Sequence, residues 1–240
     1  MKKISQEAEN LLAVRSIYGV AAIKAIYFYA NIKYNISVGG VNSMTDAQKL
    51  ASLAAADGGV LTTAAAGAAG ISKTALANYV TSNHFERVSL GIYLSPETWR
   101  DEAYLLQLRC PQIVFSHDSA LFFHELTDRE PLQSTVTVKT GYNPKHLTSQ
   151  GVKVYTVKKE LYAIGISTAA TIFNHQVRVY DMERTVCDVI RSRNSMETQV
   201  FQDALKLYAK HRGKNLQNLM DYAKTFHVEK LVQQYMGVLL

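Results

Sequence analysis

The sequence lacks most of the features on which enzymes and disulfide-stabilised proteins depend. It has two cysteines, Cys110 and Cys187, which lie far apart and have no histidine at metal-ligand spacing, so it indicates neither a disulfide framework nor a zinc site. It also has no P-loop, no glycine-rich nucleotide-binding motif and no convincing pair of carboxylates. We therefore expect no catalytic residue, no metal site and no cofactor, and the cysteine content favours a reducing cytoplasm.

A long uninterrupted apolar run is also missing. The best candidate, residues 17–36, contains Lys24, Asn31, Lys33 and Asn35. A membrane-spanning helix needs about 20 residues with few charges, and a secretory signal needs a shorter apolar run before a small-residue cleavage site. We expect a cytoplasmic protein without a membrane partner.

Positive charge is in modest excess and is unevenly distributed. The net charge of +6 over 240 residues weakly favours an anionic partner. Residues 1–43 carry +3, residues 44–98 carry −1 and residues 99–240 carry +4. A nucleic-acid partner would therefore need phosphate contacts from outside residues 44–98.

The length allows two domains, each with its own core. Residues 1–43 are interpreted as an appendage, because they combine a helical pattern with a strand-like alternation at residues 32–38 and end at a Gly-Gly pair. Residues 44–98 form the next segment, and residues 99–240 form the last. We expect these three segments to be an appendage, a small N-terminal domain and a C-terminal α/β domain.

Residues 44–98 predict a winged helix-turn-helix. Ser43 and Asp46 have the spacing of a capping box before a first helix, which stops at Gly58-Gly59. Thr62 or Thr63 can cap a short alanine-rich second helix that ends near Gly70, and Ser72 can cap a third. The strand-like runs 85–88 and 92–94, joined by Ser-Leu-Gly, predict a β-hairpin, which would be the wing.

In this architecture the third helix lies in the major groove and its first residues meet base edges. Asn78 can bond adenine in bidentate fashion, and Lys73 can reach a guanine edge or a phosphate. The predicted DNA-binding residues are Thr62, Thr63, Ser72, Lys73, Thr74, Asn78, Tyr79, Arg87 and Ser89. The alternative is a small helical core with a capping serine, which needs no nucleic acid.

The predicted fold class is α+β, with an N-terminal winged helix-turn-helix followed by a mixed α/β domain with a helical C-terminus. Residues 135–139, 152–157 and 176–180 look like strands, and the pattern is helical from Met182 onward.

Charged and polar clusters in this domain are interpreted as structural. His117, Asp118, His124 and Glu125 are expected at a capped helix and its core edge, with Ser116 or Ser119 as the cap, and not at a metal. Arg184 and Asp188 have the i, i+4 spacing of a helical ion pair, which is weakly stabilising if exposed, and Cys187 is expected to be a buried small hydrophobe.

A second phosphate-contacting surface is possible near the C-terminus, although a solvated helix end is the simpler explanation. Its candidate residues are Arg191, Arg193, Lys206, Lys210, Arg212 and Lys214.

Ordered short motifs give this chain a family resemblance. They are residues 59–63 (GVLTT), 70–72 (GIS), 86–88 (ERV) and 91–93 (GIY), followed by 116–121 (SHDSAL), 126–129 (LTDR) with Pro131, and 183–188 (ERTVCD). Their order and spacing resemble those of AbiEi-type antitoxins, the antitoxin half of a type IV toxin-antitoxin pair linked to phage abortive infection.

The resemblance implies an autoregulating repressor that binds inverted repeats in the double-stranded DNA of its own promoter. It also implies that the C-terminal domain supports neutralisation of a nucleotidyltransferase-like toxin without a stable complex. The sequence departs from the family in residues 1–43 and in a wing with one basic residue, Arg87. The alternatives are a winged-helix protein-interaction module, a transcription regulator unrelated to a toxin and, third, a nuclease.

Overall fold

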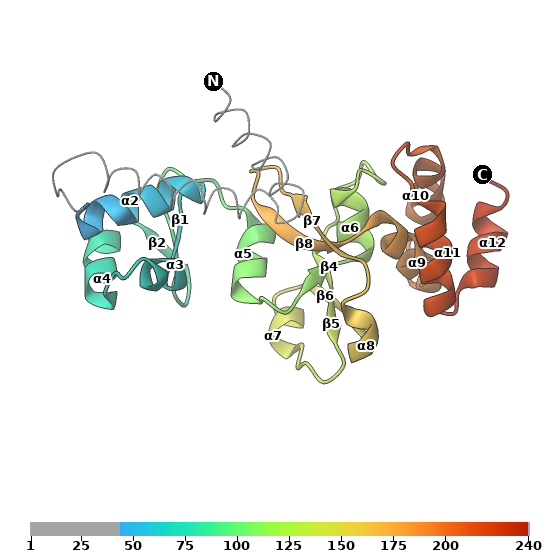
Figure 1. Cartoon of the computed structure of the whole chain (residues 1–240), viewed down its shortest axis with the longest axis horizontal. Helices are drawn as coiled ribbons and strands as arrows, with labels where there is room; N and C mark the ends of the chain where they lie inside the picture. Colours follow the sequence, from blue (N-terminus) through green and yellow to red (C-terminus); the bar gives the residue numbers. More distant parts are fainter. Residues whose placement is uncertain (1–43, 240) are drawn as a thin grey trace, which may run out of the picture. The chain divides into compact units, whose positions relative to one another are not determined.

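The computed structural model describes residues 44–239, which divide into two compact units. The first ends at Arg100 and the second begins at Asp101 (Figure 1). The predicted appendage, residues 1–43, lies outside the described residues. No helix in the described part of the chain is long and apolar enough to cross a membrane.

The first unit is a winged helix. Its elements are α2 (Asp46–Ala56), β1 (Val60–Thr62), α3 (Thr63–Ala68), α4 (Lys73–Ser82), β2 (Glu86–Ser89) and β3 (Ile92–Leu94). The strands form an antiparallel sheet in the order β1-β3-β2. The helices pack on it around a core of Leu50, Leu61, Ala66, Ile71, Leu76 and Val80. The predicted winged helix-turn-helix is confirmed.

Hydroxyl side chains begin all three helices of this unit. Thr62 Oγ1 accepts a hydrogen bond from the Ala65 amide, and Ser72 Oγ accepts one from Ala75, as the sequence predicted. For α2 the cap is Thr45, not Ser43, because Thr45 and Gln48 form a reciprocal capping box directly before Asp46.

The second unit contains a mixed five-stranded sheet in the order β6-β5-β4-β8-β7. The pairs β4·β8 and β5·β6 are parallel, and the other two are antiparallel. The strands are β4 (Val114–Phe115), β5 (Thr135–Lys139), β6 (Lys153–Val157), β7 (Ile166–Ala170) and β8 (Gln176–Tyr180). The sequence analysis missed β7, whose largely exposed residues lack the apolar alternation of a half-buried strand.

The second unit also contains helices before, between and after the strands, and those after β8 form its helical C-terminal part. They are α5 (Glu102–Arg109), α6 (His117–Phe123), α7 (Lys145–Thr148), α8 (Lys159–Tyr162), α9 (Met182–Arg191), α10 (Thr198–Lys210), α11 (Leu216–Thr225) and α12 (Glu229–Met236), with a 3-10 turn at Arg193–Ser195. Figure 1 shows α10, α11 and α12 gathered around α9. The predicted α+β class with a helical C-terminus is confirmed.

Helix α9 is the centre of the second unit. It packs against α6, α10, α11 and α12, and every residue from Glu183 to Ile190 is buried. Cys187 has no exposed surface, as expected for a small hydrophobe. This buried stretch nevertheless contains three charged side chains, Glu183, Arg184 and Asp188.

The ion pair predicted between Arg184 and Asp188 is present and is buried. Arg184 Nε lies 2.9 Å from Asp188 Oδ2, and both side chains are at most 1 % exposed. Arg184 Nη1 donates to the carbonyl oxygens of Leu161 and Ile164, each at 3.0 Å. The guanidinium therefore joins α9 to the segment between β6 and β7.

Aromatic rings enclose the same guanidinium. Its central carbon lies 4.2 Å from the centre of the Tyr180 ring and 3.9 Å from that of Phe226. Gly165 passes so close that a Cβ there would lie 2.7 Å from Arg184 Cβ. Arginine is the side chain suited to this place, because only a planar cation can stack on two rings and donate within its own plane.

Replacing Arg184 by methionine should lower the free energy of unfolding by about 3–5 kcal/mol, because Asp188 would then be buried without its main partner. Urea unfolding followed by circular dichroism measures this. The control is Arg129→Ala, which removes the exposed Arg129–Glu197 pair and should cost at most about 1 kcal/mol. Equal losses in the two variants would contradict a special role for the buried pair.

Candidate nucleic-acid interface

The outer side of α4 presents a polar surface over an apolar base. Leu76 and Val80 are buried in the core of the first unit, whereas Lys73, Thr74 and Asn78 are exposed. Since residues four apart lie on the same side of a helix, Thr74 and Asn78 are neighbours on this surface. The first two turns of α4 thus offer an amine, a hydroxyl and a carboxamide to a partner.

Two hydroxyls predicted to contact phosphate already serve the fold. Thr62 and Ser72 accept backbone hydrogen bonds at the starts of α3 and α4, at 3.0 and 3.1 Å. An accepting hydroxyl keeps its own hydrogen, so each can still donate to a phosphate oxygen.

Two further predicted contacts are partly covered. Tyr79 is half-buried, and its ring centre lies 5.8 Å from that of Phe85. Thr63 is half-buried at the first residue of α3. Thr63, at the start of α3, and Tyr79, in α4, therefore expose only part of their side chains to a partner.

The wing is short and has an irregular register. Strand β2 pairs with β3 through Arg87 opposite Tyr93 and Ser89 opposite Ile92, with a register shift between Arg87 and Ser89. Arg87 is exposed and Ser89 is half-buried. Glu86, also in β2, forms an ion pair with Arg100.

Few cations in the first unit are available to phosphates. Lys49 lies 3.7 Å from Asp46, and Arg100 is paired with Glu86. Within residues 44–100, that leaves Lys73 and Arg87 as the cations without an ion pair to a described residue. With only two such cations, this unit would need phosphate contacts from elsewhere in the protein, as the net charge of −1 over residues 44–98 also indicates.

The six basic residues predicted as a second surface differ in whether their side chains are already paired or hydrogen-bonded. Arg191 lies 3.2 Å from Asp188, and Arg193 donates to the Ile190 carbonyl. Lys206 lies 3.5 Å from Asp203, and Lys214 Nζ is 3.5 Å from the His211 carbonyl oxygen. The remaining two, at the end of α10, are Lys210 and Arg212, and both are exposed.

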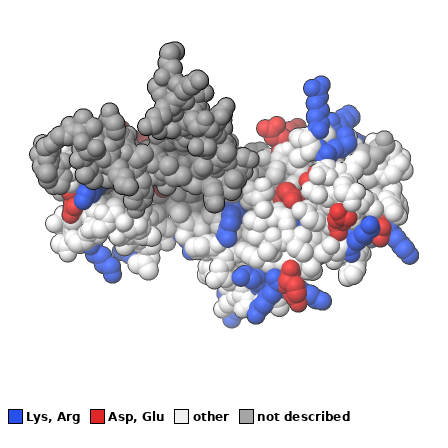
Figure 2. Space-filling view, viewed as in Figure 1, with Lys and Arg blue, Asp and Glu red and all other residues white. Residues whose placement is uncertain are grey.

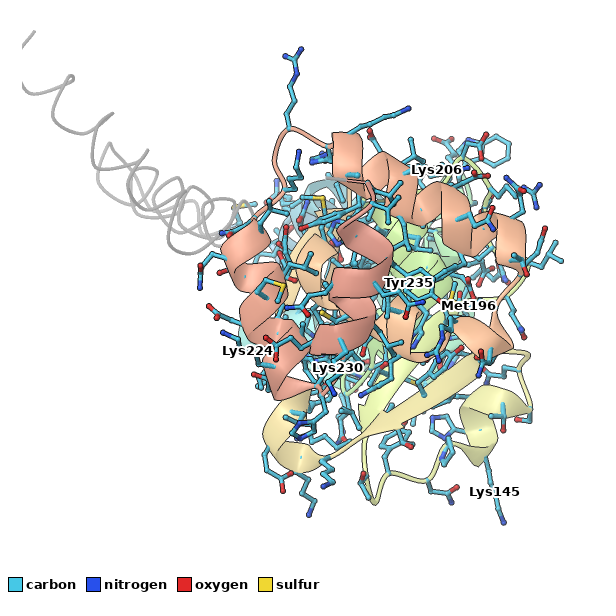
Figure 3. The ribbon with its side chains drawn as sticks, turned by 90° about the vertical axis from the view of Figure 1, so that its right-hand side faces the viewer. Lys145, Met196, Lys206, Lys224, Lys230 and Tyr235 are labelled. Carbon is cyan, nitrogen blue, oxygen red and sulfur yellow. The ribbon has the colours of Figure 1, made fainter. Side chains whose placement is uncertain are left out.

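Other lysines of the helical end are dispersed. Figure 3 shows Lys206 well separated from Lys224 and Lys230, which belong to α11 and α12. These three side chains do not form a compact basic surface.

A different group of lysines was missed by the sequence analysis. Lys139 ends β5, and Lys158 and Lys159 follow β6; because these strands are parallel, with Lys139 paired to Val157, the three lysines meet at one sheet edge. All three are exposed, and none has an ion pair among the described residues. Figure 2 shows Lys and Arg side chains gathered around α7 and α8, with acidic side chains among them. We call Lys139, Lys158 and Lys159 the strand-end lysines.

His117, at the start of α6, lies within a network of hydroxyls and rings. His117 is fully buried, with its ring nitrogens 3.0 and 3.1 Å from the hydroxyl oxygens of Ser116 and Ser192, and its ring stacks on Tyr155 at 3.5 Å. Burial, with Arg191, Lys153 and Arg184 nearby, holds the pKa of His117 well below its ordinary value. No three His, Cys, Asp or Glu side chains in the described ranges could hold a metal ion.

The helix cap predicted at Ser116 is confirmed in its position but lacks the capping hydrogen bond. Ser116 occupies the N-cap position of α6 without a capping hydrogen bond from its side chain. Its hydroxyl instead accepts a hydrogen bond from Thr137 Oγ1 at 2.8 Å.

A pocket of about 510 Å³ in the second unit is lined by paired charges. Asp118 and Lys153 lie 3.9 Å apart on its wall, and Arg129 and Glu197 lie 2.9 Å apart across its rim. Opposite charges that are paired in this way give the pocket no preference for an anion, so it adds nothing to a nucleic-acid interface.

Comparison with solved structures supports this architecture. The chain is similar to the crystal structure of the RV2827C protein from Mycobacterium tuberculosis, with a TM-score of 0.50 and 13% identity over 79% of each chain. At that identity the similarity concerns the fold alone. No curated protein matches the chain in sequence.

The sequence of the first unit matches a known family. Residues 48–96, which run from the first helix through the wing, match the family described as transcriptional regulator, AbiEi antitoxin. This span contains α4 and the whole β2–β3 hairpin. The resemblance to AbiEi-type antitoxins is therefore confirmed over residues 48–96, which carry the domain of that family of transcriptional regulators.

Proposed function

We propose that this protein is a type IV antitoxin that represses its own operon and counters a nucleotidyltransferase-like toxin. The observation that carries the proposal is the coincidence of two features over the same residues. The AbiEi family match spans a winged helix whose α4 exposes a polar surface suited to the major groove.

Base recognition is assigned to the first two turns of α4. Asn78 would bond adenine in bidentate fashion, and Lys73 would reach a guanine edge or an adjacent phosphate. Ser72, Thr74 and the α3 threonines would donate to phosphates. Inverted repeats in the operator would each take one winged helix, which requires two protomers on the DNA.

Affinity is assigned in part to the second unit, since the first has few available cations. The strand-end lysines are the favoured source, because they are exposed, close together and without an ion pair to a described residue, although Lys139 Nζ lies 5.1 Å from the centre of the Tyr162 ring. Lys210 and Arg212, at the end of α10, would add to it. These residues would neutralise phosphates without reading sequence.

Loss of Lys73 and Asn78 should abolish discrimination between operator and unrelated DNA. Each base contact contributes about 1–3 kcal/mol of discrimination, so Lys73→Ala and Asn78→Ala should each reduce the ratio of specific to nonspecific affinity by at least about fivefold. Titration of the full chain against its own upstream DNA, with scrambled DNA beside it, measures the ratio.

Lys49→Ala is the matched control, because it also removes a lysine from this unit but from the Asp46 pair on α2. It should leave the ratio unchanged. Absence of any preference of the unmodified protein for its upstream DNA would overturn the proposed repression and favour a protein-interaction module.

Removal of two strand-end lysines should weaken the salt dependence of binding. The slope of log affinity against log salt falls by about 0.9 for each phosphate contact that is lost, so Lys158→Ala/Lys159→Ala should give a shallower slope at both operator and unrelated DNA. Lys224→Ala/Lys230→Ala removes the same charge from α11 and α12 and should not change it. An identical slope in both double variants would reject this lysine group.

The antitoxin role is tested by growth. If the gene next to that of this chain encodes a nucleotidyltransferase-like toxin, as the proposal requires, expression of the two together should restore growth, and the two proteins should not co-purify. The Lys73→Ala/Asn78→Ala variant should rescue equally well, because neutralisation is assigned to the second unit. Continued growth arrest with the unmodified chain would refute the antitoxin role.

A further inference from the structure

The tip of the wing carries an exposed leucine. Strand β2 ends at Ser89 and β3 begins at Ile92, so Leu90 and Gly91 form a two-residue turn. Leu90 is 85 % exposed, although a hairpin tip accommodates a polar residue equally well. An apolar side chain in this position gains free energy only if a partner covers it.

The turn that bears Leu90 is held in place. Gly91 has φ +71°, its carbonyl accepts from the Thr63 amide at 2.8 Å, and a Cβ on it would lie 2.9 Å from Thr63 Oγ1. The wing tip is therefore fixed to the first residue of α3. Leu90 is presented at a defined place and not on a mobile loop.

The position of the turn relates it to α4. Helix α3 packs against α4 and is hydrogen-bonded through Thr63 to the turn, and Figure 1 shows α4 and the turn on either side of α3. With α4 in the major groove and α3 crossing the backbone, the turn would come to the adjacent minor groove.

A leucine cannot pair with a phosphate, so its contact must be with sugars or base faces. Apolar side chains that enter the minor groove partly unstack a base step and kink the duplex. The only cation of β2 is Arg87, which lies before the register shift and away from the tip. At the tip of the wing, the residue that would lie nearest the minor groove is therefore Leu90.

We infer that Leu90 is a minor-groove wedge that contacts a base step and bends the operator. This inference rests on the proposed function, since it requires α4 to bind DNA. It assigns to the wing a role in DNA shape, distinct from base reading by Asn78 and from phosphate contact by the lysines.

The test compares Leu90→Ala with Arg87→Ala in the full chain on the operator. Leu90→Ala should weaken binding about tenfold, the order expected for uncovering a leucine side chain. It should also reduce the bend, measured by energy transfer between dyes at the duplex ends, and leave the salt slope unchanged. Arg87→Ala should instead make the slope shallower by about 0.9.

Leu132→Ala is the matched control, because Leu132 is also fully exposed but lies in the second unit. It should change neither affinity nor bend, and Leu90→Met should restore most of both. Unmodified affinity and bend in Leu90→Ala would overturn the wedge while the operator-binding function stands. If the unmodified protein does not prefer its operator, the proposed function fails and the wedge fails with it.

Discussion

The second unit depends on one buried ion pair. Arg184 and Asp188 lie one turn apart on α9, and their charges would destabilise the core if either were alone. The guanidinium also donates to two carbonyl groups and stacks between the rings of Tyr180 and Phe226. Helix α9, the β6–β7 connection, the end of β8 and the residue after α11 therefore meet at one side chain. Helices α10, α11 and α12 pack around α9, and their arrangement follows from its position.

The two units divide the proposed DNA-binding work between them. The first has a well-defined recognition surface on α4 but only Lys73 and Arg87 as available cations. The second has cations in excess, and those at the ends of β5 and β6 are brought together by parallel pairing. In the proposed complex, sequence discrimination and much of the electrostatic attraction therefore come from different parts of the chain.

Local signals predicted the three helices and the hairpin of the first unit, but not β1 or the cap of α2. The cap at Ser72, the paired glycines after α2 and the short hairpin each depend only on residues that are close together in the sequence. The second unit depends on contacts distant in sequence. The i, i+4 spacing of Arg184 and Asp188 is the same on the surface and in the core, so only the packing of other helices distinguishes the two cases.

The same limit applies to the candidate site. Asn78 and Lys73 could be predicted as neighbours because both lie on one helix. Lys139 and Lys158, in contrast, are neighbours only because β5 and β6 pair in parallel register. The basic residues predicted as a second surface near the end of α10 are close together in the sequence. In the structure, several of those cations are occupied by nearby acceptors, as with Lys206 and Asp203.

The cap of α4 has a consequence for how DNA would be read. Ser72 Oγ accepts from the Ala75 amide and keeps one hydrogen that can be donated outward. The atom that fixes where the helix starts is thus the atom that would touch the phosphate. Any slip of the helix start by one residue would rotate Asn78 by about 100° around the helix axis and move that anchor as well. The reading frame on the DNA and the first hydrogen bond of the helix are consequently set by a single oxygen.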